Sequence, residues 1–392
     1  MRNLRILHIC YDGSWIHPLL KELEQRADIM RINPSKRERT QIRMTESIAA
    51  VYKERIEQFQ PDIIHVHGTE NNLGQLQHFY PDIPVVVSIQ GVLTGCLPYS
   101  TGGLSRKDVI PFTTLKNVLH QGGLMAFHRR ISYGSRTFEE DILSSCRFFF
   151  CRTDWDREWV KKYNPQAVIY QGEELLRPAF YEKAGLWNEP SATPHTIFMP
   201  SGFNPIKGLH HAITAVSLLV KEFHDVKLRV PGIPANIYHR TGLVYRLIGE
   251  EYLGYIRRLI EKLNVQDHVE FLPYLSADGM ANEMLRANVF ISPSSIDNSP
   301  NAVGEAMMLG LPIVCTPVGG VPSFVHHEEN GLLAEPRDIA IAIDRIFKDS
   351  TLANELGTQA YQTALLRHDK ELAAEQYISA YFDILEKNKR TK

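Results

Sequence analysis

The sequence predicts an α/β protein built from two doubly wound units, each a parallel sheet covered by helices. First, 392 residues are too many for one ordinary core, so two domains of about 200 residues each are expected. Second, short runs rich in Ile, Val and Phe recur without alternating with polar residues, which is typical of strands buried on both faces. Third, these runs alternate twice over with longer helical patterns, which indicates two Rossmann-like units.

The expected strands divide the chain into two halves. Those of the first half are residues 4–10, 63–66, 85–89, 148–151 and 168–170, and those of the second half are residues 197–199, 227–230, 269–272, 289–292 and 313–316. The polar segment 187–196 contains two prolines and is the best linker candidate. We therefore expect a first domain at residues 1–187, a second at residues 188–369 and a final segment at residues 370–392.

The final segment is expected to be an amphipathic helix at about residues 370–387. Its apolar face carries Ala373, Tyr377, Tyr381 and Ile384. The pattern leaves open which domain this face covers, and packing back on the first domain is one possibility.

Composition excludes several classes of function. Lys and Arg number 43 against 45 Asp and Glu, so no basic field indicates a nucleic-acid partner. The five cysteines are widely spaced and mostly lie in apolar runs, which favours buried thiols in a reducing compartment over disulfides or a zinc site. No stretch approaches the ~20 apolar residues of a membrane span, and the first apolar run is too short for a signal peptide. A cytoplasmic protein is expected.

Residues 92–144 form an insertion between two expected strands that is too long for a simple crossover, and such insertions usually carry function. It mixes apolar residues with Arg129, Arg130 and Arg136. We predict that these side chains form an apolar and cationic rim on the first domain, together with Lys36, Arg37, Arg39 and Arg43. Such a rim would suit peripheral contact with an anionic membrane. The alternative is that the insertion folds over the first domain and only shapes an acceptor pocket.

Residues 291–312 are expected to hold a strand, a polar loop and a phosphate-binding helix. Ser299 is a plausible N-cap, Pro300 suits the first helical position, and Gly310 suits the position past the helix end. A helix that opens at the carboxyl edge of a parallel sheet attracts phosphate. Glu305 lies roughly 6–9 Å further along the helix, where it can bind ribose hydroxyls. Asp297, just before the cap, is placed to hold hydroxyls of a sugar.

This segment resembles the motif of retaining family-four glycosyltransferases of the bacterial polysaccharide type. In that motif two glutamates are separated by seven residues, and an EAM sequence, a Gly and a Pro follow. Asp297 and Glu305 have this spacing, and Glu305 opens the EAM sequence, which Gly310 and Pro312 follow. The first acid is Asp here. The resemblance implies a GT-B arrangement, in which two Rossmann-like domains face each other across a cleft, and donor contacts at four residues: Asn298, Ser299, Pro300 and Asn301.

A second match lies after the first expected strand of the second half. In the family a Lys-Gly pair opens the next helix and places its ammonium on the donor diphosphate, and Lys207 with Gly208 fits this pattern. The Arg that the family usually carries several residues earlier is absent from residues 201–204. Gly319 and Gly320 resemble the family's Gly-Gly turn, whose backbone lies close to the donor.

On the acceptor side, the first half carries several polar residues at the expected strand ends. Gln90, before Gly91, stands where the family often has a His, and because an amide cannot carry a proton no general base is expected there. Thr153 and Asp156 form a capping-box pattern around Asp154. Glu174 belongs to a segment that takes the place of the family's Asn-Gly turn.

His65 and His67 share one face of an expected strand, so a metal pair is conceivable. Without a further carboxylate or cysteine at ligand spacing, a polar wall of the cleft is favoured, with His67 on it, and no metal is expected.

The resemblance implies transfer of a sugar, with retention, from a nucleotide-diphosphate sugar to a glycan or lipid-linked acceptor in surface polysaccharide or glycoconjugate biosynthesis. Catalysis would rest on Lys207, Asp297 and Glu305, with Lys207 and helix N–H groups stabilising the departing diphosphate. No cofactor and no metal are expected. The alternatives are a nucleotide-sugar epimerase on the same fold and a non-catalytic sugar-binding subunit of a glycosylation complex. A dehydrogenase is disfavoured because no G-x-G-x-x-G follows the first strand.

Overall fold

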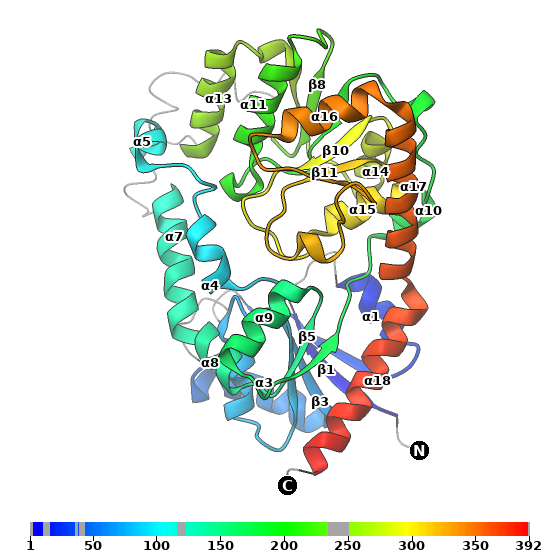
Figure 1. Ribbon diagram of the computed structural model, residues 1–392. Coiled ribbons are helices and arrows are strands. Elements are labelled where there is room, and N and C mark those ends of the chain that lie inside the picture. The colour runs from blue at the N-terminus through cyan, green and yellow to red at the C-terminus, as the bar shows by residue number, and fades with distance from the viewer. Residues whose placement is uncertain are drawn as a thin grey trace. The chain divides into compact units, whose positions relative to one another are not determined.

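The computed structural model describes residues 3–10, 16–35, 38, 44–115, 123–233 and 251–390. The chain divides into two compact units (Figure 1). The first contains Met1–Leu97, Ile131–Leu176 and Arg367–Lys392, and the second contains Pro98–Arg130 and Arg177–Leu366.

A six-stranded parallel sheet, in the order β2-β1-β3-β4-β5-β6, forms the centre of the first unit. Its strands are β1 (Arg5–Ile9), β2 (Asp28–Ile32), β3 (Ile63–His67), β4 (Val85–Ser88), β5 (Phe148–Cys151) and β6 (Val168–Gln171). From β1 the chain turns to β2 on one side and then to β3 on the other. The topological switch point, where such sheets bind ligands beyond their carboxyl ends, therefore lies between β1 and β3.

Helices cover both faces of this sheet. They are α1 (His17–Leu23), α3 (Glu46–Phe59), α4 (Leu93–Cys96), α8 (Glu140–Ser145), α9 (Asp154–Tyr163) and α18 (Lys370–Lys389). Alternate residues of a strand face opposite sides, so Leu7 and Ile9 pack with α3 and α8, whereas Ile6 packs with α1 and α18. The apolar face of α18, which carries Tyr377 and Tyr381, is thus buried in the first unit.

The second unit contains a second six-stranded parallel sheet, in the order β12-β11-β10-β7-β8-β9. Its strands are β7 (Thr196–Phe198), β8 (Lys227–Pro231), β9 (Val269–Leu272), β10 (Val289–Ser292), β11 (Ile313–Cys315) and β12 (Leu332–Leu333). Its helices are α5 (Arg106–Val109), α10 (Pro178–Glu182), α11 (Leu209–Leu219), α13 (Glu251–Leu263), α14 (Ala277–Leu285), α15 (Asn301–Leu309), α16 (Ile339–Lys348) and α17 (Ser350–Arg367). Here the switch point lies between β7 and β10.

The expected fold class is confirmed, and each strand expected from the sequence is present within one residue at either end. Two edge strands, β2 and β12, were not expected. In β2 only Ile32 is fully buried, and β12 has two residues, so neither presents a long apolar run.

The division into units differs from the expected boundaries at 187/188 and 369/370. The chain passes from one unit to the other after Leu176 and again after Leu366. The expected linker lies inside the second unit, because the Trp187 indole N–H donates to the Ala287 carbonyl at 2.8 Å and the Trp187 backbone N–H donates to Leu309 at 3.0 Å. Its polar composition therefore marks the entry to β7 and not a domain boundary.

The expected rim on the first domain is contradicted in part, because Arg136 belongs to the first unit whereas Arg129 and Arg130, within Pro98–Arg130, belong to the second unit. There the buried Glu251 carboxylate of α13 accepts the Thr113 hydroxyl at 2.7 Å and the Leu124 backbone N–H at 2.9 Å. Lys36, Arg37, Arg39 and Arg43 lie outside the described residues. None of the helices in the described ranges combines the length and hydrophobicity that crossing a membrane requires.

Candidate functional site

Lys207 and Asp297 meet at the switch point of the second sheet. Lys207 follows β7 and Asp297 follows β10, and these two strands are paired. The Lys207 ammonium donates to Asp297 Oδ2 at 2.6 Å, and the Ser294 hydroxyl lies 3.3 Å from the same oxygen. The side chain of Lys207 is 37% exposed and that of Asp297 is 14% exposed, so solvent reaches this ion pair. The structure therefore brings two of the three predicted catalytic residues into contact where ligands of such sheets bind.

The loop that carries Lys207 is held by a short polar turn. Asn204 Oδ1 accepts the Ile206 N–H at 3.1 Å and caps the 3-10 turn η6 (Pro205–Lys207). Gly208 follows with φ of 76° and begins α11. A Cβ at Gly208 would lie 1.9 Å from the Pro293 carbonyl oxygen in the loop after β10, so only glycine allows this close approach.

Gly319 and Gly320 hold the loop that carries Asp297. Gly319 has φ of 54°, and a Cβ there would lie 2.0 Å from the Asp297 carbonyl oxygen. The Gly320 N–H donates to this carbonyl at 3.0 Å. The glycine pair thus fixes the backbone of Asp297. A direct contact of Gly319 and Gly320 with a donor stays a prediction.

Helix α15 begins at Asn301, one residue later than expected. Its N-cap residue is Pro300, whose ψ of 112° is extended, so the expectation of Ser299 as N-cap was wrong by one position. Gly310 ends the helix with φ of 83°, as predicted. Asn298 is buried before this helix start, and the donor contacts expected for these residues remain predictions.

Glu305 lies in the second turn of α15 and is only 2% exposed. The Arg177 guanidinium forms a bidentate hydrogen bond with this carboxylate. Its Nε donates to Oε1 at 2.6 Å and its Nη2 donates to Oε2 at 2.7 Å. Burial raises the pKa of Glu305, and the Arg177 guanidinium opposes this rise. Sequence reasoning missed Arg177 because it precedes Glu305 by 128 residues and belongs to no motif. The proposed contact of Glu305 with ribose stays a prediction.

Arg177→Leu is expected to lower the free energy of unfolding by about 1–3 kcal/mol, because it leaves the Glu305 carboxylate buried without its partner. The Arg177 side chain is 25% exposed, so the loss should be smaller than for a fully buried pair. Urea denaturation measures it, and Arg177→Leu/Glu305→Leu is the control that should recover part of the loss. An unchanged midpoint in Arg177→Leu would show that the pair contributes nothing.

In the first unit, Arg152 connects the predicted acceptor residues. Its Nη2 donates to the Gln90 carbonyl at 3.0 Å, and its Nη1 lies 3.0 Å from Glu174 Oε2. Both Arg152 and Glu174 are buried, so Glu174 forms a buried ion pair shortly after β6, and its contact with an acceptor stays a prediction. The Gly91 carbonyl accepts the Thr69 hydroxyl at 2.9 Å.

The capping box at the start of α9 is confirmed, with reciprocal bonds between Thr153 and Asp156. Thr153 is buried, and Asp154 is exposed at the first helical position. The Thr153 side chain is used in capping the helix. A contact of Thr153 or Asp154 with an acceptor stays a prediction.

Glu70, just beyond the end of β3, is a candidate that sequence reasoning did not select. Crowding by surrounding protein atoms raises the pKa of its carboxyl to about 7, although the residue itself reaches solvent. The Glu139 carboxylate adds to this rise. The Glu70 carboxylate lies close to the backbone of Gly68 and Gly91. A Cβ added at Gly68 would lie 2.2 Å from its Oε2, and a Cβ added at Gly91 would lie 3.3 Å from its Oε1.

His67 belongs to a buried cluster with His8 and His65 on the face of the first sheet that α18 covers. One ring nitrogen from each lies within 4.8 Å of the others, which is the spacing of a possible metal site. His8 Nδ1 and His67 Nε2 lie 2.9 Å apart, and His65 hydrogen-bonds the hydroxyls of Tyr381 at 2.7 Å and Ser88 at 2.6 Å. The three rings are buried and hydrogen-bonded, so His67 is part of a polar core and not of an exposed wall, and the absence of a metal stays a prediction.

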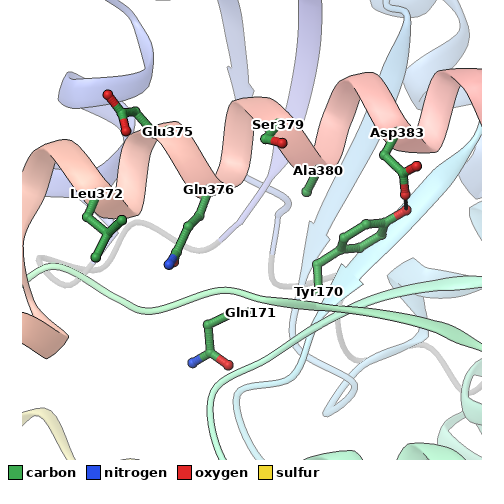
Figure 2. Close-up of a pocket in the computed structure, with 8 residues that line it drawn as sticks. All are labelled: Tyr170, Gln171, Leu372, Glu375, Gln376, Ser379, Ala380 and Asp383. Carbon is green, nitrogen blue, oxygen red and sulfur yellow. Dashed lines mark hydrogen bonds between the residues drawn. The ribbon is translucent and has the colours of Figure 1, made fainter.

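A surface hollow lies between β6 and α18 of the first unit (Figure 2). Figure 2 shows the Tyr170 hydroxyl pointing to Asp383, to which it donates at 2.6 Å. None of the predicted site residues lines this hollow.

Comparisons with known proteins bear on the second unit most directly. Residues 187–363 match the family model described as "Glycosyl transferases group 1". Residues 187–363 therefore resemble a group 1 glycosyltransferase domain. This domain holds Lys207, Asp297, Glu305 and the glycines that fix their loops.

Among curated proteins, the chain is similar to the putative glycosyltransferase YtcC of Bacillus subtilis, with 29% identity over 56% of this chain and 56% of that protein. It is also similar to the N-acetyl-alpha-D-glucosaminyl L-malate synthase of Bacillus anthracis, with 26% identity over 49% of this chain and 46% of that enzyme. The matched parts thus span about half the length of these relatives.

Solved structures resemble the whole chain. Sucrose-phosphate synthase from Thermosynechococcus elongatus has a TM-score of 0.67 and 16% identity, over 98% of this chain and 99% of that one. Anabaena HepE in complex with UDP and glucose has a TM-score of 0.63 and 14% identity, over 97% of this chain and all (100%) of that one. At such low identity this likeness concerns the fold alone, and it supports the two-domain α/β GT-B fold that accompanies the group 1 domain.

Proposed function

We propose that this protein is a retaining glycosyltransferase that moves a sugar from a nucleotide-diphosphate donor to a glycan or lipid-linked acceptor. The observation that carries the proposal is the Lys207–Asp297 pair, which lies at the switch point of a group 1 glycosyltransferase domain. A cation there binds the donor diphosphate and stabilises its charge as it departs. Asp297 is the hydrogen-bond acceptor for hydroxyls of the transferred sugar.

In the structure Asp297 is the counter-ion of Lys207, at 2.6 Å. A diphosphate carries more charge than one carboxylate, so a bound donor draws the ammonium toward itself and frees Asp297 for the sugar. The same two residues thus serve both ends of the donor. No observation favours the epimerase or the non-catalytic subunit over this function.

The role that we propose for the reaction is the building of a surface polysaccharide or glycoconjugate on the cytoplasmic side of a membrane. A lipid-linked acceptor requires the enzyme to reach that membrane, and peripheral contact with anionic lipid remains a proposal. Within the insertion, Ile110 and Leu115 are exposed apolar residues of the second unit that would serve such contact.

A thermal-shift screen tests the donor class. UDP is the first nucleotide to examine, because the structure of the fold neighbour HepE contains UDP and glucose. GDP and ADP follow. We expect one of these nucleotides to raise the melting temperature of the wild-type protein, since a ligand that binds only the folded state stabilises it. A protein stabilised by none of the three would contradict the proposed donor class.

Activity is expected to survive EDTA. The proposed charge stabilisation comes from Lys207 and backbone N–H groups, which need no divalent ion. The assay compares the initial rate of sugar transfer before and after dialysis against the chelator. Loss of activity that returns only with Mg²⁺ or Mn²⁺ would show that a metal carries the diphosphate charge.

A further inference from the structure

The insertion places a glycine-rich turn beside the loop that carries Lys207. The turn comprises Thr101, Gly102 and Gly103 and belongs to the second unit, although its chain segment follows β4 of the first. Two backbone bonds shape it, from Gly102 N–H to Tyr99 at 2.8 Å and from Leu104 N–H to Thr101 at 3.2 Å. In Figure 1 the insertion continues into α5, which packs against α13 of the same unit.

Gly102 docks this turn onto the loop. It is buried with φ of 66°, and a Cβ there would lie 2.2 Å from the carbonyl oxygen of Pro205, two residues before Lys207. The imidazole of His210, in the first turn of α11, lies with Nε2 3.0 Å from the Gly102 carbonyl and with Nδ1 2.9 Å from the Tyr252 hydroxyl. Burial lowers the pKa of His210 to about 3, so the neutral ring donates to Gly102 and accepts from Tyr252. Polar bonds therefore fix the turn to the start of α11.

Gly103, the next residue of the turn, makes no such close approach. It is exposed, its φ is 79°, and a Cβ there would meet no atom within 4 Å. This positive φ favours glycine, and without a side chain the backbone of Gly103 is exposed. An exposed backbone N–H group in such a turn attracts anions. The neighbouring loop supplies Lys207, whereas residues 201–204 before it carry no further cation.

We propose that the 101–103 turn is a wall of the donor site and that the backbone at Gly103 contacts the anionic diphosphate of the nucleotide-sugar donor. The inference rests on the proposed function and adds a binding element from outside the group 1 domain. The turn precedes residues 187–363 by more than 80 positions in the chain. The contact of Gly102 with Pro205 brings the turn to the loop that carries Lys207.

Substitutions at Gly103 test this inference. Gly103→Ala adds a methyl group and Gly103→Asn a larger side chain that tolerates positive φ, and both extend into the space where the donor would lie. The matched control is Gly310→Ala, which imposes the same backbone strain at φ of 83°, with the nearest atom 3.7 Å from its Cβ, at the opposite end of α15. Calorimetric titration with UDP, GDP and ADP, each used separately, gives the affinities, and melting temperatures report folding.

We expect the nucleotide that binds the wild type to bind about threefold more weakly to Gly103→Ala and at least about tenfold more weakly to Gly103→Asn, with Gly310→Ala unchanged. Wild-type affinity in Gly103→Asn would overturn the inference and leave the proposed function standing. An equal loss in Gly310→Ala would also overturn it, because strain alone would then explain the effect. If none of the three nucleotides binds the wild type, the proposed function fails and this inference fails with it.

Discussion

Lys207→Ala is expected to lower kcat by about 10²- to 10³-fold, because it removes the one side-chain cation that we assign to the departing diphosphate. Charge on the leaving group grows in the transition state, so the KM for the donor should change much less than kcat. Steady-state rates of nucleotide release at saturating donor provide the measurement.

Two further variants isolate the charge of Lys207. Lys207→Arg keeps the cation next to Asp297 and should retain more activity than Lys207→Ala, although the bulkier guanidinium will not restore it fully. Lys221→Ala removes an exposed lysine of the same unit and should leave kcat unchanged. Wild-type kcat in Lys207→Ala would remove Lys207 from the mechanism.

The first unit is expected to lose stability as the pH falls from 7.5 to 5.5. Burial, followed by the charge of Arg31, lowers the pKa of His8 to about 3, and burial also holds the pKa values of His65 and His67 well below 6.5. In the unfolded chain these rings take up protons near pH 6.5, so the unfolded state binds more protons below that pH. The stabilisation is therefore complete above pH 6.5 and is lost on acidification. It is on the order of 1 kcal/mol for each histidine over this interval, or a few kcal/mol for the three together.

Urea denaturation at the two pH values, followed by circular dichroism, measures this loss. His8→Gln removes one of the three rings and should reduce the pH dependence by about a third. His327→Gln, which replaces a half-exposed histidine of the second unit, should leave it unchanged. An identical pH dependence in wild type and His8→Gln would mean that the cluster takes up protons while folded.

The parts of the fold that the sequence predicted are those in which pattern and burial agree. Long apolar runs such as that of β1 produced strands, and the glycine at position 310 ended α15 as expected. The edge strand β2 was not predicted, because four of its five residues are partly or fully exposed and it has no continuous apolar run. The contact between Lys207 and Asp297 was not predicted, although each residue was placed after a strand of the second half, and the pairing of β7 with β10 brings the two together.

The residues that sequence reasoning missed act through partners far away in the chain. Arg177 meets Glu305 across 128 positions, and Thr113 meets Glu251 across 138. Neither pair has a local spacing that a pattern can reveal. The second pair is one of the contacts that hold Pro98–Arg130 in the second unit, and a contact across so many positions leaves no local pattern in the sequence. His8 was missed because a single histidine in an apolar strand gives no sign of the two that face it from β3.

We propose that the switch point of the second sheet binds and activates a nucleotide-sugar donor. The most direct measurement is the release of nucleoside diphosphate from UDP-, GDP- and ADP-sugars by the wild type and by Lys207→Ala, with NMR of the anomeric proton in the sugar product. The account predicts release from one donor class, its loss in Lys207→Ala and a product of unchanged anomeric configuration. Release that Lys207→Ala leaves intact, or no release from any of the three donor classes, would contradict it.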